Sequence, residues 1–377
     1  MDTEQMANES EARVKLEALF RAAAKANASD IHLRVGSPPR IRVDGELKVV
    51  PRQPVLDEMD TELLAMQMMR PDVAARFASV SEVDFAVTSQ QGQRFRVSVY
   101  RQRNSVGIVM RLVITEPRSI ADLRLPEAVA SLADEQRGLV LVTGPTGCGK
   151  TTTVAAMIDR INRSRPVHIV TIEDPIEVEH HDKRGSITQR EVGADTPEFA
   201  SAMRVALRQD PDVIFVGEMR DRETALAALS AAETGHLVFS TLHTLDAGET
   251  MNRILEFFPE AQQKQARLML AGTLRGTIGQ RLVQGADGHR VPAVEVMIAT
   301  GRVRQAIEAA ESGDKLQRII AEGEYYGMQT FDQSLAKLIE DGRIEIRDAM
   351  AASSNPHDLT VHLRRKGIMS TKEAGKE

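Results

Sequence analysis

The chain has 377 residues, of which 42% are hydrophobic and 27% are charged, and its formal net charge is −6. A chain of this length can form two or three domains, each with its own hydrophobic core. Its net negative charge excludes an overall positive electrostatic potential that would attract nucleic acid. A single cysteine excludes an intrachain disulfide framework and a multi-cysteine zinc site. No apolar run approaches the roughly 18 residues of a membrane span. With a polar start unlike a signal peptide, these features predict a cytoplasmic protein.

The first part of the chain has the pattern of a small α+β domain. Residues 1–10 are polar, and we expect a disordered tail there. Apolar residues at helical spacing then predict an amphipathic helix over 11–26. Alternating segments, with Asp-Gly suited to a hairpin turn at 44–45, predict strands at 31–35, 40–43, 46–49, 95–99 and 106–113. We therefore expect an antiparallel sheet within a domain of residues 11–113.

A different pattern follows the proline-containing segment 114–122, which we interpret as a linker. Short apolar strands then alternate with helices, and this predicts a parallel sheet covered by helices on both faces. The candidate strands are 139–143, 167–172, 213–217 and 237–242. After Phe257 the chain is predicted to be mainly helical. The second domain is expected to cover 123–369, and 370–377 to form a second tail.

The most specific motif lies between the first of these strands and a predicted helix over 150–162. Its sequence fits G-x-x-x-x-G-K-[ST], the phosphate-binding loop of many nucleotide-hydrolysing enzymes. The loop consists of Gly144, Pro145, Thr146, Gly147, Cys148, Gly149, Lys150 and Thr151, with Thr152 next on the helix. Backbone N–H groups and the helix N-terminus favour phosphate there, Lys150 would reach the terminal phosphates of ATP, and the Thr151 hydroxyl would ligate Mg²⁺. The alternative is a chance glycine-rich turn.

Acidic residues follow two other predicted strands. Glu218 ends the strand at 213–217, and in phosphate-loop ATPases the neighbouring strand carries an acid that polarises the attacking water. Gly217 stands where a metal-contacting aspartate is usual, so Glu173 and Asp174 are the predicted suppliers of carboxylates for the magnesium shell. The alternative for Glu218 is a solvated acid at a strand end.

His243 leaves the strand 237–242 beside the predicted site, and we assign it to sensing or positioning the γ-phosphate; a structural histidine is the alternative. Cys148 lies within the loop, where a helix N-terminus would lower the pKa of its thiol. A redox role and a small residue that simply fits are both open for Cys148.

Four blocks of sequence together resemble one family. They are 29–45 (Ser-Asp-Ile-His-Leu through Val-Asp-Gly), the phosphate loop 144–151, 171–177 (Thr-Ile-Glu-Asp-Pro-Ile-Glu), and 210–221 with 235–244. The chain is similar to the ATPases of type II secretion and type IV pili, and especially to pilus retraction motors of the PilT type. The resemblance runs from Leu16 to Leu363. It implies a PAS-like N-terminal domain, a RecA-like ATPase domain with a helical C-terminal part, and ATP with Mg²⁺ as ligands.

The resemblance also implies an assembly. It predicts a homohexamer at the cytoplasmic face of the inner membrane, which acts on a membrane platform protein and can work with a paralogous motor. Arg96 and Arg111 match arginines that reach the phosphates from the PAS-like domain; two solvated strand arginines are the alternative. The net charge and the absence of tryptophan disfavour a nucleic-acid partner.

Two absences indicate retraction rather than extension. The chain lacks the four-cysteine zinc module and the additional N-terminal domain that the resemblance associates with extension and secretion motors. One departure favours an accessory, PilU-like role instead: in 302–309, Glu308 replaces the second arginine of the block Ala-Ile-Arg-Asn-Leu-Ile-Arg-Glu. Three competing hypotheses are a secretion or assembly ATPase that lost its zinc module, a nucleotide-gated regulatory subunit, and a helicase.

Overall fold

The computed structural model describes residues 3–26, 28–43, 45–113 and 115–369. The chain divides into two compact units, Met1–Thr115 and Glu116–Glu377. The division falls inside the segment 114–122. Among the described residues, no helix is both long enough and apolar enough to cross a membrane. The predicted tail at 370–377 lies outside the described residues.

The first unit contains six strands and three helices among the residues that the structure describes. They are α1 (Thr3–Lys25), β1 (Asp30–Arg34), β2 (Arg40–Val43), β3 (Glu46–Val49), α2 (Glu58–Met68), α3 (Pro71–Val80), β4 (Glu82–Thr88), β5 (Arg94–Gln102) and β6 (Ser105–Leu112). The strands form one antiparallel sheet in the order β3-β2-β1-β6-β5-β4. The predicted antiparallel sheet is confirmed, but helix α1 begins within the predicted tail, and α2, α3 and β4 were not predicted.

Side-chain alternation explains how this sheet acquires one covered face. Ile31 and Leu33 of β1 are buried together with Phe20 of α1 and Phe95 of β5, and the two phenylalanine rings stack at 4.5 Å between centroids. The residues between them in each strand project from the opposite face because successive strand residues alternate in direction. That second face carries Arg96 and Arg111, which alternate with the buried Phe95 and Met110.

The second unit begins with the predicted strands and helices. Its elements are α4 (Glu127–Ala133), β7 (Gly138–Thr143), α5 (Lys150–Ser164), β8 (His168–Glu173), β9 (Ser186–Glu191), α6 (Phe199–Ala206), β10 (Val213–Val216), α7 (Arg222–Glu233), β11 (Leu237–Leu242), α8 (Ala247–Glu256), α9 (Glu260–Thr273), β12 (Leu274–Gln284), β13 (Arg290–Ile298), α10 (Gly301–Glu308), α11 (Gly313–Ala321), η1 (Glu324–Tyr326), α12 (Phe331–Glu340), α13 (Ile346–Ala352) and α14 (Pro356–Arg365). All four predicted strands are present, within one residue at either end.

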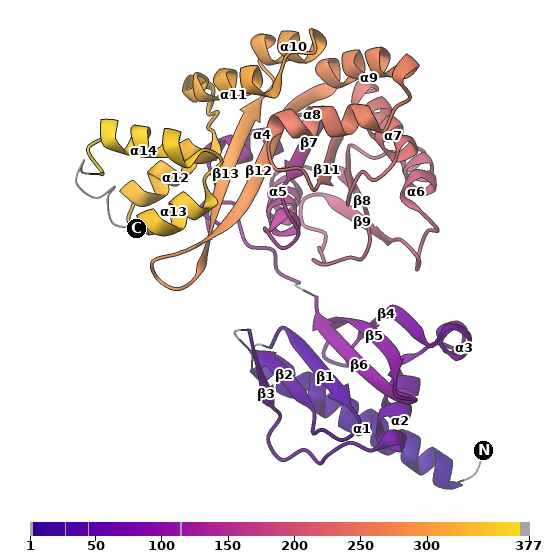
Figure 1. The fold of residues 1–377 in the computed structure, drawn as a ribbon. Coiled ribbons are helices and arrows are strands. Elements are labelled where there is room, and N and C mark those ends of the chain that lie inside the picture. The colour runs from indigo at the N-terminus through magenta and orange to yellow at the C-terminus, as the bar shows by residue number, and fades with distance from the viewer. Residues whose placement is uncertain (1–2, 27, 44, 114, 370–377) are drawn as a thin grey trace. The chain divides into compact units, whose positions relative to one another are not determined.

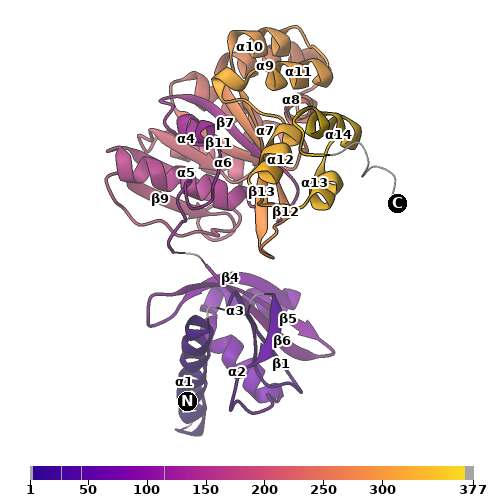
Figure 2. The same ribbon diagram turned by 90° about the vertical axis from the view of Figure 1, so that its left-hand side faces the viewer.

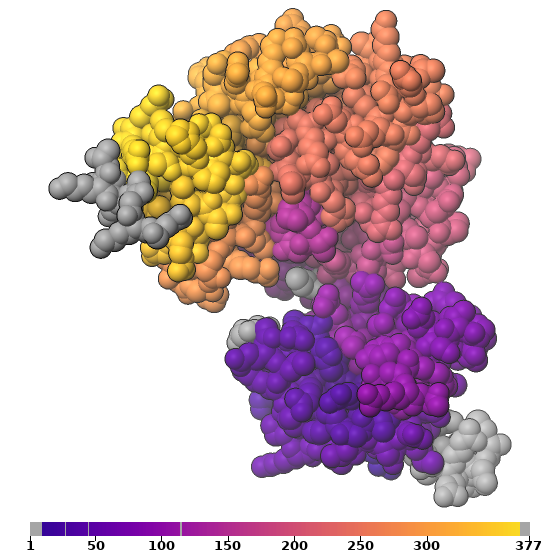
Figure 3. Space-filling view, in the orientation of Figure 1, coloured from indigo at the N-terminus to yellow at the C-terminus, as the bar shows by residue number. Residues whose placement is uncertain are grey.

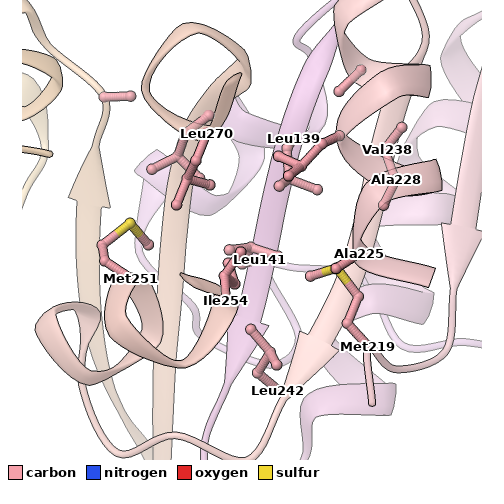
Figure 4. Close-up of a cluster of buried hydrophobic side chains, with 14 of the residues drawn as sticks. Leu139, Leu141, Met219, Ala225, Ala228, Val238, Leu242, Met251, Ile254 and Leu270 are labelled. Atoms are coloured by element: carbon pink, nitrogen blue, oxygen red, sulfur yellow. The ribbon is translucent and has the colours of Figure 1, made fainter. Parts of the chain in front are cut away.

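A seven-stranded sheet organises this unit, in the order β13-β12-β7-β11-β10-β8-β9. Only the β12–β13 pair is antiparallel. Helices lie on both faces (Figures 1 and 2) because the strands are apolar on both sides. Leu139 and Leu141 pack with α7, α8 and α9, as Figure 4 shows, whereas Val140 and Val142 pack on the other face with α4 and α5.

One feature of this unit was not predicted and one expectation was wrong. The chain after Phe257 is mainly helical, as predicted, but the strands β12 and β13 extend the sheet there, and β12 pairs directly with β7. The strand that carries Glu218 is not the neighbour of β7, since β11 lies between β7 and β10. Strand order in a parallel sheet depends on how crossover helices pack, and the order of segments along the chain does not reveal it.

Candidate functional site

The phosphate loop connects β7 to α5 at the carboxyl edge of the central sheet. Gly144, Gly147 and Gly149 have φ angles of +141°, +77° and +93°, a region that only glycine adopts without strain. Gly149 is the N-cap of the 15-residue helix α5. Pro145, Thr146 and Gly147 are exposed, and the magenta segment that contains α5 reaches the surface in Figure 3. The backbone therefore has the form of an anion site at a helix N-terminus.

Lys150, His243 and Glu218 form a chain of contacts at this loop. The Lys150 ammonium donates to the carbonyl oxygens of Gly144 at 2.8 Å and Pro145 at 3.2 Å, and it lies 3.4 Å from His243 Nδ1. His243 Nε2 is 3.4 Å from Glu218 Oε2. Lysine only donates, so Nδ1 accepts, and the proton of a neutral His243 lies on Nε2, facing Glu218. Burial lowers the pKa of Lys150.

The structure thus brings together three residues that are distant in sequence, from α5, from the end of β10 and from the end of β11. Thr146 also approaches His243, with 3.5 Å between its hydroxyl oxygen and Nδ1. A cavity of about 450 Å³ opens beside Glu218 and His243 and is bounded on its far side by α8. This volume is within the range of small-molecule sites.

Arg220 is a site residue that sequence reasoning missed. Its guanidinium forms an ion pair with Glu218 and lies 3.6 Å from Asp174, so it joins the two acidic strand ends. The sequence offered one signal for Arg220, its position two residues after Glu218. In an extended segment, side chains two residues apart project to the same side. Gly217 allows these strand ends to meet: a Cβ there would lie 3.2 Å from the carbonyl oxygen of Ile172.

Glu173 is buried at the end of β8. Its Oε1 accepts hydrogen bonds from the Thr171 hydroxyl at 2.6 Å and from Gln189 Nε2 at 3.0 Å. Burial raises the pKa of Glu173 to about 7, although the two hydrogen bonds act to lower it. The next residue, Asp174, is exposed. Within the described part of the chain, no three His, Cys, Asp or Glu side chains converge to hold a metal ion by themselves.

Cys148 is buried inside the loop. Burial raises the pKa of its thiol, and this outweighs the opposing effect of Lys150. The thiol is therefore protonated and covered, which favours a small residue that fits over a redox switch.

Arg96 and Arg111 belong to the first unit and lie directly opposite each other on β5 and β6. Arg111 Nε donates to Asp30 Oδ1 at 2.8 Å, and Arg42 approaches the other oxygen of Asp30 at 3.8 Å. Burial opposes ionisation of Asp30, but hydrogen bonds from Ser29 and Arg111 outweigh it and lower its pKa. Adjacent strands thus present several guanidinium groups on one face of the sheet.

The fold and the loop define a nucleotide-binding protein of the phosphate-loop class, and comparison with known proteins identifies its family. The family model "Type II/IV secretion system protein" matches residues 5–365, and the chain belongs to this family.

Two relatives from Pseudomonas aeruginosa match almost throughout. The "Type IV pilus retractation ATPase PilT" is 41% identical over 341 residues, which cover 90% of this chain and 98% of the relative. The "Type IV pilus ATPase PilU" is 38% identical and covers 93% and 92%. A crystal structure of "the Pilus Retraction Motor PilT and Bound ADP" superposes with a TM-score of 0.85 at 44% identity, covering 92% and 98%. The chain is a homologue of the PilT retraction ATPase.

Proposed function

We propose that this protein is an ATP-hydrolysing motor that powers retraction of type IV pili. The observation that carries the proposal is the series of contacts from Lys150 to His243 to Glu218 at a phosphate loop. The chain that contains this series is homologous to a retraction ATPase over nine-tenths of the chain's own length. The contacts place a phosphate-binding cation, an imidazole and a carboxylate in sequence, which is the composition of a site that binds and hydrolyses a nucleoside triphosphate.

Each site residue receives a role in this proposal. The loop from Gly144 to Thr152 binds the phosphates, and Lys150 leaves the loop carbonyls for the β- and γ-phosphates. Glu218 orients and deprotonates the attacking water, and His243 contacts the γ-phosphate. Arg220 holds Glu218 until the nucleotide is in place, because its guanidinium forms an ion pair with the Glu218 carboxylate.

Magnesium suits the oxygen donors at this edge of the sheet. The Thr151 hydroxyl and the carboxylates of Glu173 and Asp174, partly through water, are ligands of the hard type that Mg²⁺ prefers. Bound magnesium would neutralise charge on the phosphates. The buried position of Glu173 fixes its carboxyl through Thr171 and Gln189, so it can orient a water molecule with little loss of freedom.

The finer architecture is also part of the proposal. We assign residues 11–113 to a PAS-like domain, 114–122 to a linker, and 123–369 to a RecA-like ATPase domain with C-terminal helices. Arg96 and Arg111 of the PAS-like domain stabilise the γ-phosphate, because planar guanidinium groups match phosphate oxygens. Hydrolysis then moves one domain against the other through the linker.

The proposed assembly is a homohexamer at the cytoplasmic face of the inner membrane. It rotates the platform protein from which pilin subunits return to the bilayer. An accessory, PilU-like motor is the second candidate, and the similar identity to PilU supports it. So does α10, where Glu308 stands in place of an arginine and Arg302 pairs with Glu322 at 3.0 Å.

Surface pili and twitching in a strain that lacks this chain test the proposal. Complementation with the wild type or with Lys150→Ala separates the ATPase from a passive role. Excess pili without twitching, restored by the wild type alone, are expected of the main retraction motor. Normal twitching in the deletion strain would favour the accessory motor, and cells without pili would refute retraction in favour of assembly or secretion.

A further inference from the structure

The side chain of Gln280 on β12 is buried against the phosphate loop. Its Nε2 donates to the carbonyl oxygen of Cys148 at 2.7 Å, and its Oε1 accepts from the Thr153 hydroxyl at 2.7 Å. Gln280 is 3% exposed. One amide thus contacts both the loop and the first turn of α5.

The backbone of Gln280 also approaches the loop closely. A Cβ on Gly144 would lie 2.3 Å from the Gln280 carbonyl oxygen, and a Cβ on Gly149 would lie 2.7 Å from Gln280 Nε2. The two glycines stand at the two ends of the loop, so Gln280 packs against both. This proximity follows from the pairing of β12 with β7, in which Gly279 lies opposite Thr143.

The hydrogen bond to Cys148 sets the orientation of one peptide group. In a trans peptide the C=O and the following N–H point in opposite directions. A Cys148 carbonyl held toward β12 therefore aims the N–H of Gly149 away from β12. Glycine accepts φ values of either sign, so the peptide before Gly149 has little intrinsic preference and needs an external contact to fix it. Loop N–H groups with a common direction form the anion site.

We propose that Gln280 is a positioning residue for the nucleotide, which acts by fixing the Cys148–Gly149 peptide so that the loop N–H groups face the phosphates. The proposal rests on the proposed function of the loop as a nucleotide site. In the proposed function Lys150 leaves its carbonyl partners when it turns to phosphate, whereas Gln280 contacts the loop from β12 and needs no such movement. Gln280 thus orients the loop before the nucleotide binds.

Two substitutions of Gln280 separate its two bonds, and one matched control lies on the same strand. Gln280→Met keeps the length of the side chain and removes both bonds. Gln280→Glu keeps the acceptor for Thr153 and, when ionised, loses the donor to Cys148. Gln284→Met changes an exposed glutamine at the end of β12. Calorimetric titration with ADP gives the affinity, and thermal unfolding without nucleotide shows that each variant is folded.

Both Gln280 variants should bind ADP roughly tenfold more weakly or worse, the loss typical of residues that orient direct ligands. Gln284→Met should match the wild type. The loss of ADP affinity in Gln280→Glu relative to the wild type should become smaller as pH falls. A protonated carboxyl group again has a donor for the Cys148 carbonyl oxygen. A purely structural role would show this pH dependence in the thermal unfolding of the nucleotide-free variant and not in the affinity of the folded variant for ADP.

A folded Gln280→Met with wild-type affinity for ADP would overturn the proposal. If that variant does not fold, Gln280→Glu decides: equal affinity to wild type at pH values above its carboxyl pKa would overturn it as well. Failure of the wild type to bind ADP would instead remove the proposed function of the loop. Steady-state ATP hydrolysis by the Gln280 variants is a second measurement. We expect KM for ATP to rise by a larger factor than kcat falls.

Discussion

Glu295 on β13 offers a sharp test of the buried electrostatics near the site. Its Oε1 accepts from the backbone N–H of Ala247 at 2.9 Å, and its Oε2 accepts from Gln317 Nε2 at 3.0 Å. It therefore joins the first turn of α8, just after His243, to α11. Burial raises the pKa of Glu295 to about 7, although both hydrogen bonds oppose the rise. The perturbation is Glu295→Gln, which keeps the size and removes the titration.

The magnitude follows from the gap between the folded and unfolded pKa values. The unfolded value is 4.5 and the folded value about 7, so ionising this carboxyl in the folded protein costs about 3.5 kcal/mol more than in the unfolded chain, at about 1.4 kcal/mol per pH unit. Because the folded pKa is the higher one, the contribution to stability is fully present below pH 4.5. It is lost as pH rises through about 7, since the unfolded chain releases the proton first.

The assay is urea unfolding of wild type and Glu295→Gln at about pH 5 and about pH 8. The stability of the wild type relative to the variant should fall by about 2.5 kcal/mol between these values. Glu173 titrates in the same range but is present in both proteins, so its contribution cancels in the difference. A difference that stays constant within about 0.5 kcal/mol would refute the reasoning from burial.

Three further predictions concern the loop and the candidate base. Glu218→Gln should bind ATP and lose hydrolysis by about 10²- to 10⁴-fold; undiminished hydrolysis would remove Glu218 as the base. Gly144→Ala should weaken ADP binding, because its Cβ would meet the Gln280 carbonyl oxygen at 2.3 Å. Gly193→Ala is the control, since it has a φ of +86° and open space around it, and equal effects on ADP binding would contradict the steric argument. Cys148 should react slowly with thiol reagents in the folded protein and quickly after unfolding, because it is buried with a raised pKa; rapid labelling of the folded chain would show that the loop opens readily.

Sequence reasoning succeeded where the signal is local. The strands 139–143 and 237–242 were predicted because continuous apolar runs of this length suit buried parallel strands. Asp221 is of a residue type that typically caps helices, and its side chain accepts from the N–H of Thr224 at the start of α7. The loop motif itself fixed the positions of Lys150 and Thr151, because its glycines and its lysine serve a single backbone geometry.

Reasoning from sequence failed where a contact depends on strand order or on burial. It missed β12 and β13, whose polar and glycine residues interrupt the apolar pattern, and with them Gln280 and Glu295. It did not find Arg220, because its ion pair with Glu218 and its approach to Asp174 depend on how the segments after β10 and β8 lie beside each other.

By itself, the sequence determined the phosphate loop, the division of the chain into two structural patterns, and the acidic and histidine residues that lie near the loop. These depend on residue type and short spacing, which local backbone geometry translates directly into structure. Only the tertiary structure decided that β11 lies between β7 and β10, so that His243 stands between Lys150 and Glu218. Only it raised the pKa of Glu173, by burying the carboxyl group at the end of β8. Only it placed Gln280 against the loop, because Gln280 and Cys148 are more than a hundred residues apart in the sequence.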